Sequence, residues 1–276
     1  MRAIAHSASE KEERLVTRFA PAPTGHLHIG HVVNALYVWR TARRSGGRVL
    51  LRIEDHDTQR SGPEYEKSIL EDLEWLGFTS DAPVVRQSER GELYEQALTR
   101  LSAQGLVYAC ECSRRDITEV SGGGSELRYP GTCADKGLSP ATGRALRARL
   151  PTSEVPFTDL LLGPQRQVPA DQCGDLLVRD RRGNWTYQFA VVVDDLEQGV
   201  NLVVRGTDLL ASTGRQIQLA QLLGRAAPPD FMHHPLVMKS PTQKVSKSDG
   251  DTGIRELRAA GMSADEVLDL AGKWLV

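Results

Sequence analysis

Two histidines flank a glycine in His28-Ile-Gly-His31, directly after a loop that contains two prolines and a Thr-Gly pair. The apolar run before this loop predicts a strand, and the apolar spacing from Ile29 to Leu36 predicts a helix after it. The first N–H groups of a helix have no intrahelical partner, so this junction can bind an anion. Gly30 lets a ligand approach the backbone, and neutral histidines donate hydrogen bonds to phosphate oxygens. The motif therefore predicts a phosphate-binding site.

A second candidate phosphate contact lies more than 200 residues downstream, in Lys244-Val-Ser-Lys-Ser248. Two lysines and two serines in five residues suit a loop that closes over a polyphosphate. Either motif alone also fits a chance match or a solvated loop. The two motifs together, in this order, favour a nucleotide-binding enzyme.

The elements expected around these motifs alternate between strand and helix. The run Arg48–Asp55 is apolar on both faces, as in a central parallel strand, and its acidic end would lie where open α/β sheets bind ligands. Helices are expected from Pro63 to Gly77 and from Ser88 to Ala103. Downstream, the pattern predicts strands at 106–109, 199–205 and 234–238, a helix near 209–224, and two short closing helices, the second with the capping box Ser263-x-x-Glu266.

The character of the sequence changes at Cys110, where short apolar runs separated by Gly and Pro predict a small inserted module rich in short strands. Cys110, Cys112 and Cys133 supply three candidate thiolate ligands, whereas structural zinc takes four. No histidine lies between residues 57 and 232, so the fourth ligand would be Cys173 or, less obviously, the phenolate of Tyr129. The alternative is that these are ordinary thiols.

The composition sets limits on compartment and partners. The 276 residues carry 34 basic and 36 acidic side chains, so the net charge does not indicate a nucleic-acid partner, although a local basic face remains open. No apolar run is long enough to span a membrane, and no secretory leader precedes the first strand. Four cysteines, three of them within 24 residues, favour a metal site or free thiols in a reducing compartment. We expect a cytoplasmic protein.

The two phosphate motifs resemble the His-Ile-Gly-His and Lys-Met-Ser-Lys-Ser signatures of class I aminoacyl-tRNA synthetases, with Val245 in place of the methionine. The stretch Arg18–His31 resembles the glutamyl branch of that class. Further stretches that resemble this branch are Arg52–Asp55, Tyr187–Asp195, Val204–Thr213 and His234–Val237.

The resemblance implies an α/β fold of the class I synthetase type. A small zinc-containing α+β module would interrupt a Rossmann-like parallel sheet, and a short helical tail would follow. The implied division is 14–109 for the first catalytic half, 110–184 for the inserted module, 185–240 for the second catalytic half, and 241–276 for the lysine–serine loop and tail.

Only 28 residues follow Ser248, too few for the anticodon-reading helical domain of a glutamyl-tRNA synthetase. The chain is therefore most similar to the truncated family of glutamyl-queuosine tRNA(Asp) synthetases. That family uses ATP to activate L-glutamate and attaches it to the queuosine base of tRNA(Asp). The resemblance implies ATP with Mg2+, L-glutamate and queuosine-containing tRNA(Asp) as ligands of a monomer. It also implies a structural zinc ion held by Cys110, Cys112, Tyr129 and Cys133.

The resemblance assigns roles to single residues. Arg18 and Tyr187 would hold one carboxylate of glutamate, and Arg205 would hold the other. Glu54 would pair with the ammonium group. Ala20 and Ala22 would line the same site, His28, Gly30, His31, Lys244, Ser246 and Lys247 would contact ATP, and His28, His31 and Lys247 would stabilise the charge that develops on the phosphates. Arginines of the inserted module that would contact RNA phosphates are Arg114, Arg115, Arg128, Arg181 and Arg182.

One departure from the family pattern concerns Ala22, where the family usually has a serine that helps to bind the ammonium group. Three other interpretations remain open. A small-molecule nucleotidyltransferase also places His-x-Gly-His beside a Rossmann-like sheet, but it would leave Arg18 and Arg205 without a shared role. A non-catalytic tRNA-binding paralogue is favoured by Ala22 and opposed by the intact Lys247. The third is the catalytic domain of an ordinary glutamyl-tRNA synthetase.

Overall fold

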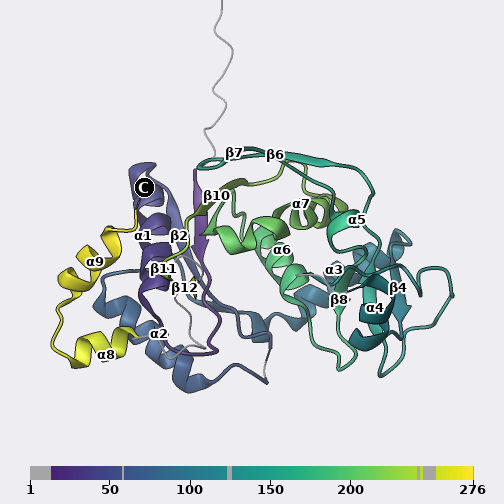
Figure 1. The fold of residues 1–276 in the computed structure, drawn as a ribbon, viewed down its shortest axis with the longest axis horizontal. Helices are drawn as coiled ribbons and strands as arrows, with labels where there is room; N and C mark the ends of the chain where they lie inside the picture. Colours follow the sequence, from purple (N-terminus) through teal and green to yellow (C-terminus); the bar gives the residue numbers. More distant parts are fainter. Residues whose placement is uncertain (1–13, 58, 123–125, 241–242, 245–252, 276) are drawn as a thin grey trace, which may run out of the picture.

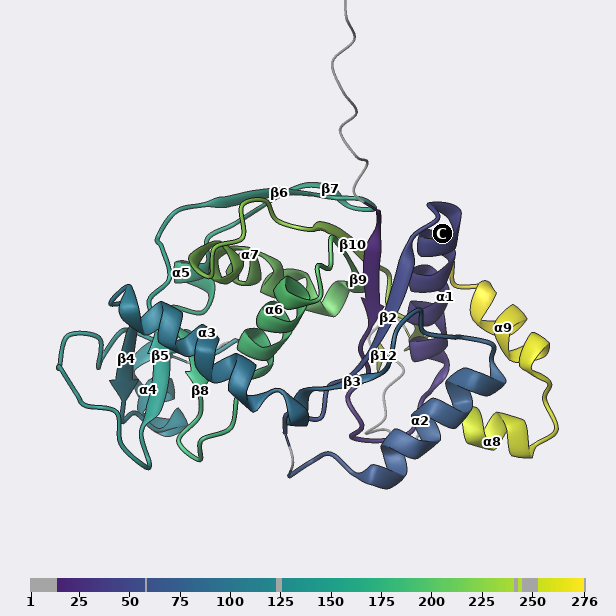
Figure 2. The same cartoon turned by 180° about the vertical axis from the view of Figure 1, so that it is seen from behind.

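The computed structural model describes residues 14–57, 59–122, 126–240, 243–244 and 253–275. Figures 1 and 2 show a body that contains the first parallel strands and the C-terminal helices, and a smaller module beside it. None of the described helices is both long and apolar enough to cross a membrane.

The first part of the chain forms a three-stranded parallel sheet in the order β1-β2-β3, from β1 (Val16–Phe19), β2 (Arg48–Ile53) and β3 (Val85–Arg86). Parallel neighbours need long crossover connections, and these contain α1 (Ile29–Arg44) and α2 (Pro63–Trp75). The prediction that β2 is a central strand is confirmed, and five of its six residues are buried.

The core of this half lies between the sheet and its helices. α1 buries Val32, Val33 and Leu36, which are residues whose spacing predicted its apolar face, and α2 buries Ile69. α2 ends before Gly77, whose φ of 77° lies in the left-handed region that glycine adopts without strain. Full burial of each such aliphatic side chain contributes about 1.5–3 kcal/mol.

The second half of the chain adds a four-stranded sheet in the order β7-β6-β10-β9. β9 (Leu202–Gly206) and β10 (Asp230–His234) are parallel, and α7 (Thr213–Leu222) connects them. The Asn201 N–H donates to Val16 O over 3.0 Å, and the Val16 N–H donates to Asn201 Oδ1 over 2.7 Å. The two sheets therefore meet where β9 lies beside β1.

The position predicted for the last strand, 234–238, is wrong, because the structure places β10 at Asp230–His234. Pro235 follows directly and has no N–H to donate to a neighbouring strand, so the ladder ends before it. The next residues form a short antiparallel pair of β11 (Met238–Ser240) and β12 (Gln243–Lys244).

The smaller module is built on an antiparallel sheet in the order β4-β5-β8, from β4 (Val107–Cys110), β5 (Ala145–Ala148) and β8 (Leu176–Arg179). The predicted boundary at residue 109 falls inside β4. The hairpin of β6 (Val155–Asp159) and β7 (Gly163–Gln167) lies within the predicted module, yet β6 pairs with β10. Strand pairing therefore assigns β4 to the module and this hairpin to the catalytic half.

Helix α3 (Gly91–Ala103) packs against α6 (Tyr187–Glu197) and links the module to the catalytic half. It starts three residues later than the predicted Ser88, because the short 3-10 helix η1 (Gln87–Glu89) precedes it. The remaining short elements of the described chain are α4 (Arg114–Ser121), α5 (Pro169–Gln172) and η2 (Thr207–Ser212).

Two short helices, α8 (Ile254–Ala259) and α9 (Ala264–Gly272), follow near the C-terminus, as predicted. The predicted capping box is confirmed, because Ser263 Oγ accepts the Glu266 N–H and the Glu266 carboxylate accepts the Ser263 N–H. Figure 1 shows α9 beside α1, and Ile254 is fully buried in the same core as the α1 face. The helical tail is therefore part of the catalytic body.

We expect Ile254→Ala to lower the free energy of unfolding by about 2–5 kcal/mol, because it removes most of a buried side chain and leaves a cavity. The matched control is Arg255→Ala at an exposed neighbour, which should change stability by less than about 0.5 kcal/mol. Urea unfolding followed by circular dichroism measures both. Equal stability of the two variants would show that the tail does not belong to the core.

Candidate active site

The predicted phosphate site lies at the start of α1, where His28 is the N-cap residue. His28 Nδ1 accepts the Gly30 N–H over 3.1 Å, and His31 Nδ1 accepts the His28 N–H over 3.0 Å. In a neutral imidazole, the nitrogen that accepts leaves the proton on the other nitrogen. The neutral form of both histidines, whose ring centroids are 3.8 Å apart, therefore has the proton on Nε2, which is the tautomer suited to donating to a phosphate oxygen.

Gly30 has a steric role that the sequence did not predict. A Cβ atom at this position would lie 2.9 Å from His28 Cε1 and 3.0 Å from His28 Nδ1. Any side chain here would therefore displace the ring that caps α1. Glycine at position 30 therefore leaves the space that the His28 ring needs to cap α1, whether or not a ligand is bound.

The lysine–serine motif falls mostly outside the described residues. Ser246 and Lys247 are not described, and Lys244 is placed only as a backbone position of β12. The described chain resumes beside the phosphate site, because Gly253 forms an antiparallel bridge with His28. The C-terminal flank of the motif is thus held against the start of α1.

The structure brings together four residues that were predicted to bind a charged ligand. They are Arg18 in β1, Glu54 after β2, Tyr187 at the start of α6 and Arg205 in β9. The charges of Arg205 and Glu54 both act on the Tyr187 phenol, in opposite directions. Burial raises the pKa of Tyr187, so the phenol stays protonated. These side chains form one buried, charged site at the carboxyl ends of parallel strands.

The loop after β1 is held against the end of β2. The Glu54 N–H donates to Pro21 O over 3.1 Å. Ala20 and Ala22 flank this proline, and both are half-buried. The structure thus places both alanines close to Glu54, and the Ala22 methyl group offers no hydrogen bond there.

Arg205 is a buried guanidinium whose hydrogen bonds to described residues go to neutral groups. Nε donates to His233 Nε2 over 3.0 Å, Nη1 to Gln216 Oε1 over 2.6 Å, and Nη2 to Thr213 Oγ1 over 2.9 Å. Because Nε2 of His233 accepts, Nδ1 carries the proton and donates it to Asp159 Oδ2 over 2.6 Å. Burial lowers the pKa of Arg205 and of His233. A buried cation whose hydrogen-bond partners are neutral is stabilised by an anionic ligand.

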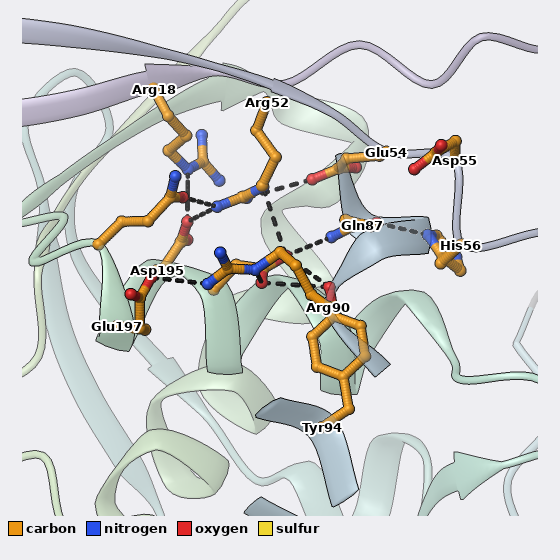
Figure 3. Close-up of polar contacts among 12 residues, drawn as sticks. Arg18, Arg52, Glu54, Asp55, His56, Gln87, Arg90, Tyr94, Asp195 and Glu197 are labelled. Carbon is orange, nitrogen blue, oxygen red and sulfur yellow. Dashed lines mark hydrogen bonds and ion pairs between the residues drawn. The ribbon is translucent and has the colours of Figure 1, made fainter. Parts of the chain in front are cut away.

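Behind Arg18 and Glu54 lies a buried ionic network that was not predicted from the sequence (Figure 3). Arg52 is fully buried in β2 and donates to Asp195 Oδ1 over 2.8 Å and to Glu54 Oε1 over 3.2 Å. Arg18 Nε donates to the same Asp195 oxygen over 3.0 Å. Asp194, the preceding residue in α6, lies 3.6 Å from Arg52 Nε. Two features of the sequence could have indicated this network: an arginine within an apolar strand, and two adjacent aspartates near the end of an apolar helix.

The carboxyl groups of this network differ in their ionisation. Burial raises the pKa of Glu54, although the charges of Arg52 and Arg18 oppose the rise. For Asp195 burial acts in the same direction, but the charges and hydrogen bonds of Arg18 and Arg52 lower its pKa overall. Asp195 is therefore the fixed anion of the network. Glu54 is the carboxyl group whose ionised form a cationic ligand would stabilise.

A cavity of about 940 Å3 opens between this site and the module. It extends from Tyr187 to Cys112 and Tyr129. Among the arginines expected to contact RNA, Arg115 pairs with Glu119 and does not line this cavity. Arg128 also lies elsewhere, whereas Arg114, Arg181 and Arg182 line the cavity together with Arg60, Arg147 and Arg215.

The three predicted thiol ligands lie together, and the Sγ atoms of Cys110, Cys112 and Cys133 are within 4.8 Å of one another. Tyr129 Oη is 3.4 Å from Cys110 Sγ and accepts the Cys133 N–H over 2.9 Å. The Cys173 thiol instead donates to backbone carbonyls outside this cluster. Of the two candidates for a fourth ligand, Tyr129 is the one beside the thiols.

The geometry of this cluster fits a tetrahedral metal ion. Ligands about 2.3 Å from a central zinc ion lie about 3.8 Å apart, close to the 3.5 Å between Cys112 Sγ and Cys133 Sγ. Burial opposes ionisation of Cys133, but hydrogen bonds from the Glu111 backbone and neighbouring groups lower its pKa overall. Burial raises the pKa of Cys112 to about 11, so this thiol needs a bound cation to ionise.

The parallel sheet, the histidine-capped helix and the charged site at the strand ends are those of a class I tRNA synthetase catalytic domain. Residues 14–269 match the family model of tRNA synthetases class I (E and Q), catalytic domain. Two relatives are named glutamyl-Q tRNA(Asp) synthetase. The one from Rhodobacter capsulatus is 39% identical over 280 residues, which cover 94% of this chain and 100% of that protein. The one from Geobacter sulfurreducens is 45% identical over 246 residues, which cover 87% of this chain and 78% of that protein. The chain belongs to the glutamyl-Q tRNA(Asp) synthetase family.

Longer ligases share the same fold. The crystal structure of a glutamate tRNA ligase from Elizabethkingia meningosepticum, in complex with its amino acid, superposes with a TM-score of 0.76 and 26% identity. The match covers 93% of this chain and 64% of that chain. The glutamate–tRNA ligase of Oleidesulfovibrio alaskensis is 39% identical over 254 residues, which cover 90% of this chain but 54% of that protein. The chain thus spans between about half and two thirds of the length of these ligases.

We expect Arg52→Met to lower the free energy of unfolding by about 3–5 kcal/mol at pH 7, because Asp195 and Glu54 lose their shared cation. Without Arg52, the native pKa of Asp195 rises and that of Glu54, which is already above its ordinary value, rises further, so protonation of these carboxyl groups reduces the loss. The loss should therefore shrink as the pH falls towards 4.

Denaturant unfolding between pH 4 and pH 7 measures this effect. The matched control is Arg48→Met in the same strand, where the half-buried arginine should contribute less than about 1 kcal/mol. A loss in Arg52→Met that stays constant or grows towards low pH would contradict the ionic role of Arg52.

Proposed function

We propose that this chain uses ATP to activate L-glutamate as glutamyl-adenylate and transfers the glutamyl group to the queuosine base of tRNA(Asp). The observation that carries the proposal is the buried guanidinium of Arg205, whose hydrogen bonds to described residues go to neutral groups. An anionic ligand group completes such a site. Beside it, Arg18 complements a second carboxylate and Glu54 complements an ammonium group, which is the charge pattern of glutamate.

The two arginines are prepared for their roles in different ways. Arg18 binds Asp195 through Nε, and Nη1 and Nη2 take no part in that contact. These two nitrogens of the guanidinium group suit the two oxygens of a ligand carboxylate. Tyr187 would share the carboxylate with Arg18, and Arg205 would take the other. Ala22 removes one polar contact to the ammonium group, a loss of roughly 1.5–3 kcal/mol unless water replaces it.

In the activation step, a carboxylate oxygen of glutamate attacks the α-phosphorus of ATP in line, and pyrophosphate leaves. No covalent bond to the protein forms, so the protein contributes positioning and electrostatic stabilisation. His28 and His31 offer Nε2–H groups, and Lys247 would join them from the loop whose flank is bridged to His28. Mg2+ would neutralise part of the phosphate charge. Gly30, Lys244 and Ser246 complete the proposed ATP contacts.

In the transfer step, a hydroxyl of the acceptor nucleotide attacks the carbonyl of glutamyl-adenylate, an ester forms and AMP leaves. The cavity beside Tyr187 would admit this nucleotide, because RNA loops present splayed bases and the lining arginines attract phosphates. The queuosine ring carries a vicinal diol like that of a terminal ribose, so the same adenylate serves. The names of the relatives from Rhodobacter capsulatus and Geobacter sulfurreducens support tRNA(Asp) as the acceptor.

A zinc ion is proposed at the thiol cluster, with Tyr129 as the fourth ligand. The ion would join the end of β4 to the loop that contains Cys133, so its role is structural. We also propose that the chain acts as a monomer in the cytoplasm, where thiols stay reduced and available to a metal.

The activation step is tested by ATP–pyrophosphate exchange without RNA. We expect exchange with L-glutamate and at least about 100-fold less with L-glutamine, because a neutral amide leaves a buried arginine without its counter-ion. L-Aspartate, which is one methylene shorter, is the control for length. Equal or greater exchange with glutamine would refute the assignment of the amino acid.

The transfer step is tested with radiolabelled glutamate and three RNAs: queuosine-containing tRNA(Asp), the same tRNA without queuosine, and tRNA(Glu). We expect label on the first alone, recovered in its anticodon fragment after nuclease cleavage. Label on tRNA(Glu), or on a fragment with the 3′ end, would indicate an ordinary glutamyl-tRNA synthetase.

Elemental analysis tests the metal. We expect about one zinc ion per chain, lost in Cys110→Ser together with the stability of the module, because the site exists only in the folded state. The matched control is Cys173→Ser, a buried thiol outside the cluster that should retain the metal. Zinc-free unmodified protein, or full retention in Cys110→Ser, would refute the site.

A further inference from the structure

His56 lies two residues beyond Glu54, after the carboxyl end of β2, and lines the cavity that begins at Tyr187. Neither the phosphate site nor the amino-acid site uses this side chain. Within the described part of the chain its only hydrogen bond joins Nδ1 to Gln87 Oε1 over 2.6 Å. Figure 3 shows His56 at the end of the buried ionic network, on the far side of Gln87.

The orientation of the Gln87 amide is fixed from behind. Its Nε2 donates to Asp194 Oδ2 over 2.7 Å, and an ionised carboxylate can only accept. The oxygen of the amide therefore faces His56, and this oxygen requires a donor. Gln87 and Asp194 are 1% and 0% exposed, so neither group can turn to water instead. Nδ1 of the neutral His56 ring consequently carries the proton.

Asp194 is itself held in place by several donors. Arg90 Nε donates to it over 2.6 Å, and Tyr94 Oη donates over 3.0 Å. Its carboxylate also lies 3.6 Å from Arg52 Nε. The network that positions Arg18 and Glu54 thus also selects the tautomer of His56.

The segment that carries His56 is fixed on both sides of the cavity. The Asp55 carboxylate accepts the Ser88 N–H over 2.8 Å and the Ser88 hydroxyl over 2.6 Å. Arg182 of the module donates to Gln59 Oε1 over 2.7 Å. The ring is therefore positioned before any ligand arrives, where the catalytic half and the module meet.

The cavity wall offers many donors, because the arginine side chain only donates. The carboxylates of the wall are already engaged with groups of the chain itself. Glu126 binds Arg215, and Asp180 binds the backbone of its own turn. Asp57 and Asp175 likewise accept hydrogen bonds from neighbouring groups. A neutral His56 adds to this wall an acceptor nitrogen that carries no charge.

We propose that His56 presents its unprotonated Nε2 to the cavity and accepts a hydrogen bond from a hydroxyl of the acceptor nucleotide. The proposal rests on the proposed function, because it requires an RNA nucleotide with a hydroxyl donor in this cavity. A vicinal diol has two such donors, so His56 holds one hydroxyl while the other reacts. His56 then contributes to the recognition of the modified base.

Two variants separate this role from a structural one. His56→Phe keeps a ring of similar size but has neither the donor to Gln87 nor the acceptor. In His56→Gln the amide nitrogen can donate to Gln87 Oε1, and the amide oxygen can face the cavity. We compare single-turnover transfer from preformed glutamyl-adenylate to queuosine-containing tRNA(Asp) with the rate of ATP–pyrophosphate exchange.

The ratio of the transfer rate to the exchange rate should fall about three- to tenfold in His56→Phe, which corresponds to one lost hydrogen bond. It should recover to within about twofold of the unmodified chain in His56→Gln. Filter binding should show that the unmodified chain prefers queuosine-containing tRNA(Asp) over the same tRNA without queuosine. His56→Phe should lose this preference.

An unchanged ratio in His56→Phe would overturn the proposal. So would a ratio in His56→Gln as low as that in His56→Phe, because an acceptor at this position would then have no effect. Failure of the proposed function looks different, because the unmodified chain itself would not transfer glutamate to queuosine-containing tRNA(Asp).

Discussion

One fully buried guanidinium, that of Arg52, joins groups on which both sides of the active site depend. It binds Asp195 and Glu54 and lies close to Asp194; Glu54 directly follows β2, and both aspartates lie in α6. Removing such charges from water costs several kcal/mol each unless they are paired closely. The strand and the helix must therefore keep the relative position in which these charges meet. Through Asp195 the network orients Arg18, and through Asp194 it orients the groups that face the cavity.

The distribution of counter-ions explains why the site is suited to its ligand. Arg18 has a fixed anion in Asp195, whose pKa is lowered by Arg18 and Arg52. Arg205 is held in position by His233 and other neutral groups. A ligand carboxylate therefore supplies the counter-ion that Arg205 does not have among these groups. Because burying a cation without a counter-ion is costly, the site favours an acidic amino acid over a neutral one.

Local patterns in the sequence predicted local features of the structure. The helix capped by His28, the capping box at Ser263 and the thiol cluster around Cys110 depend on residues close together in the chain or on a specific motif. The ionic network could not be predicted in this way, because Arg52 and Asp195 are 143 residues apart and neither belongs to a spacing pattern. The assignment of the β6–β7 hairpin depended equally on pairing with a distant strand. The steric need for Gly30 required the position of the capping ring.

The most direct test of this account is the binding of L-glutamate to Arg205→Gln, measured by isothermal titration calorimetry beside the unmodified chain. If the ligand carboxylate is the missing counter-ion, the affinity for glutamate should fall at least about 30-fold, as expected when one partner of a buried charge pair is removed. The variant should also lose most of its preference for glutamate over glutamine. An unchanged affinity for glutamate in Arg205→Gln would contradict the account.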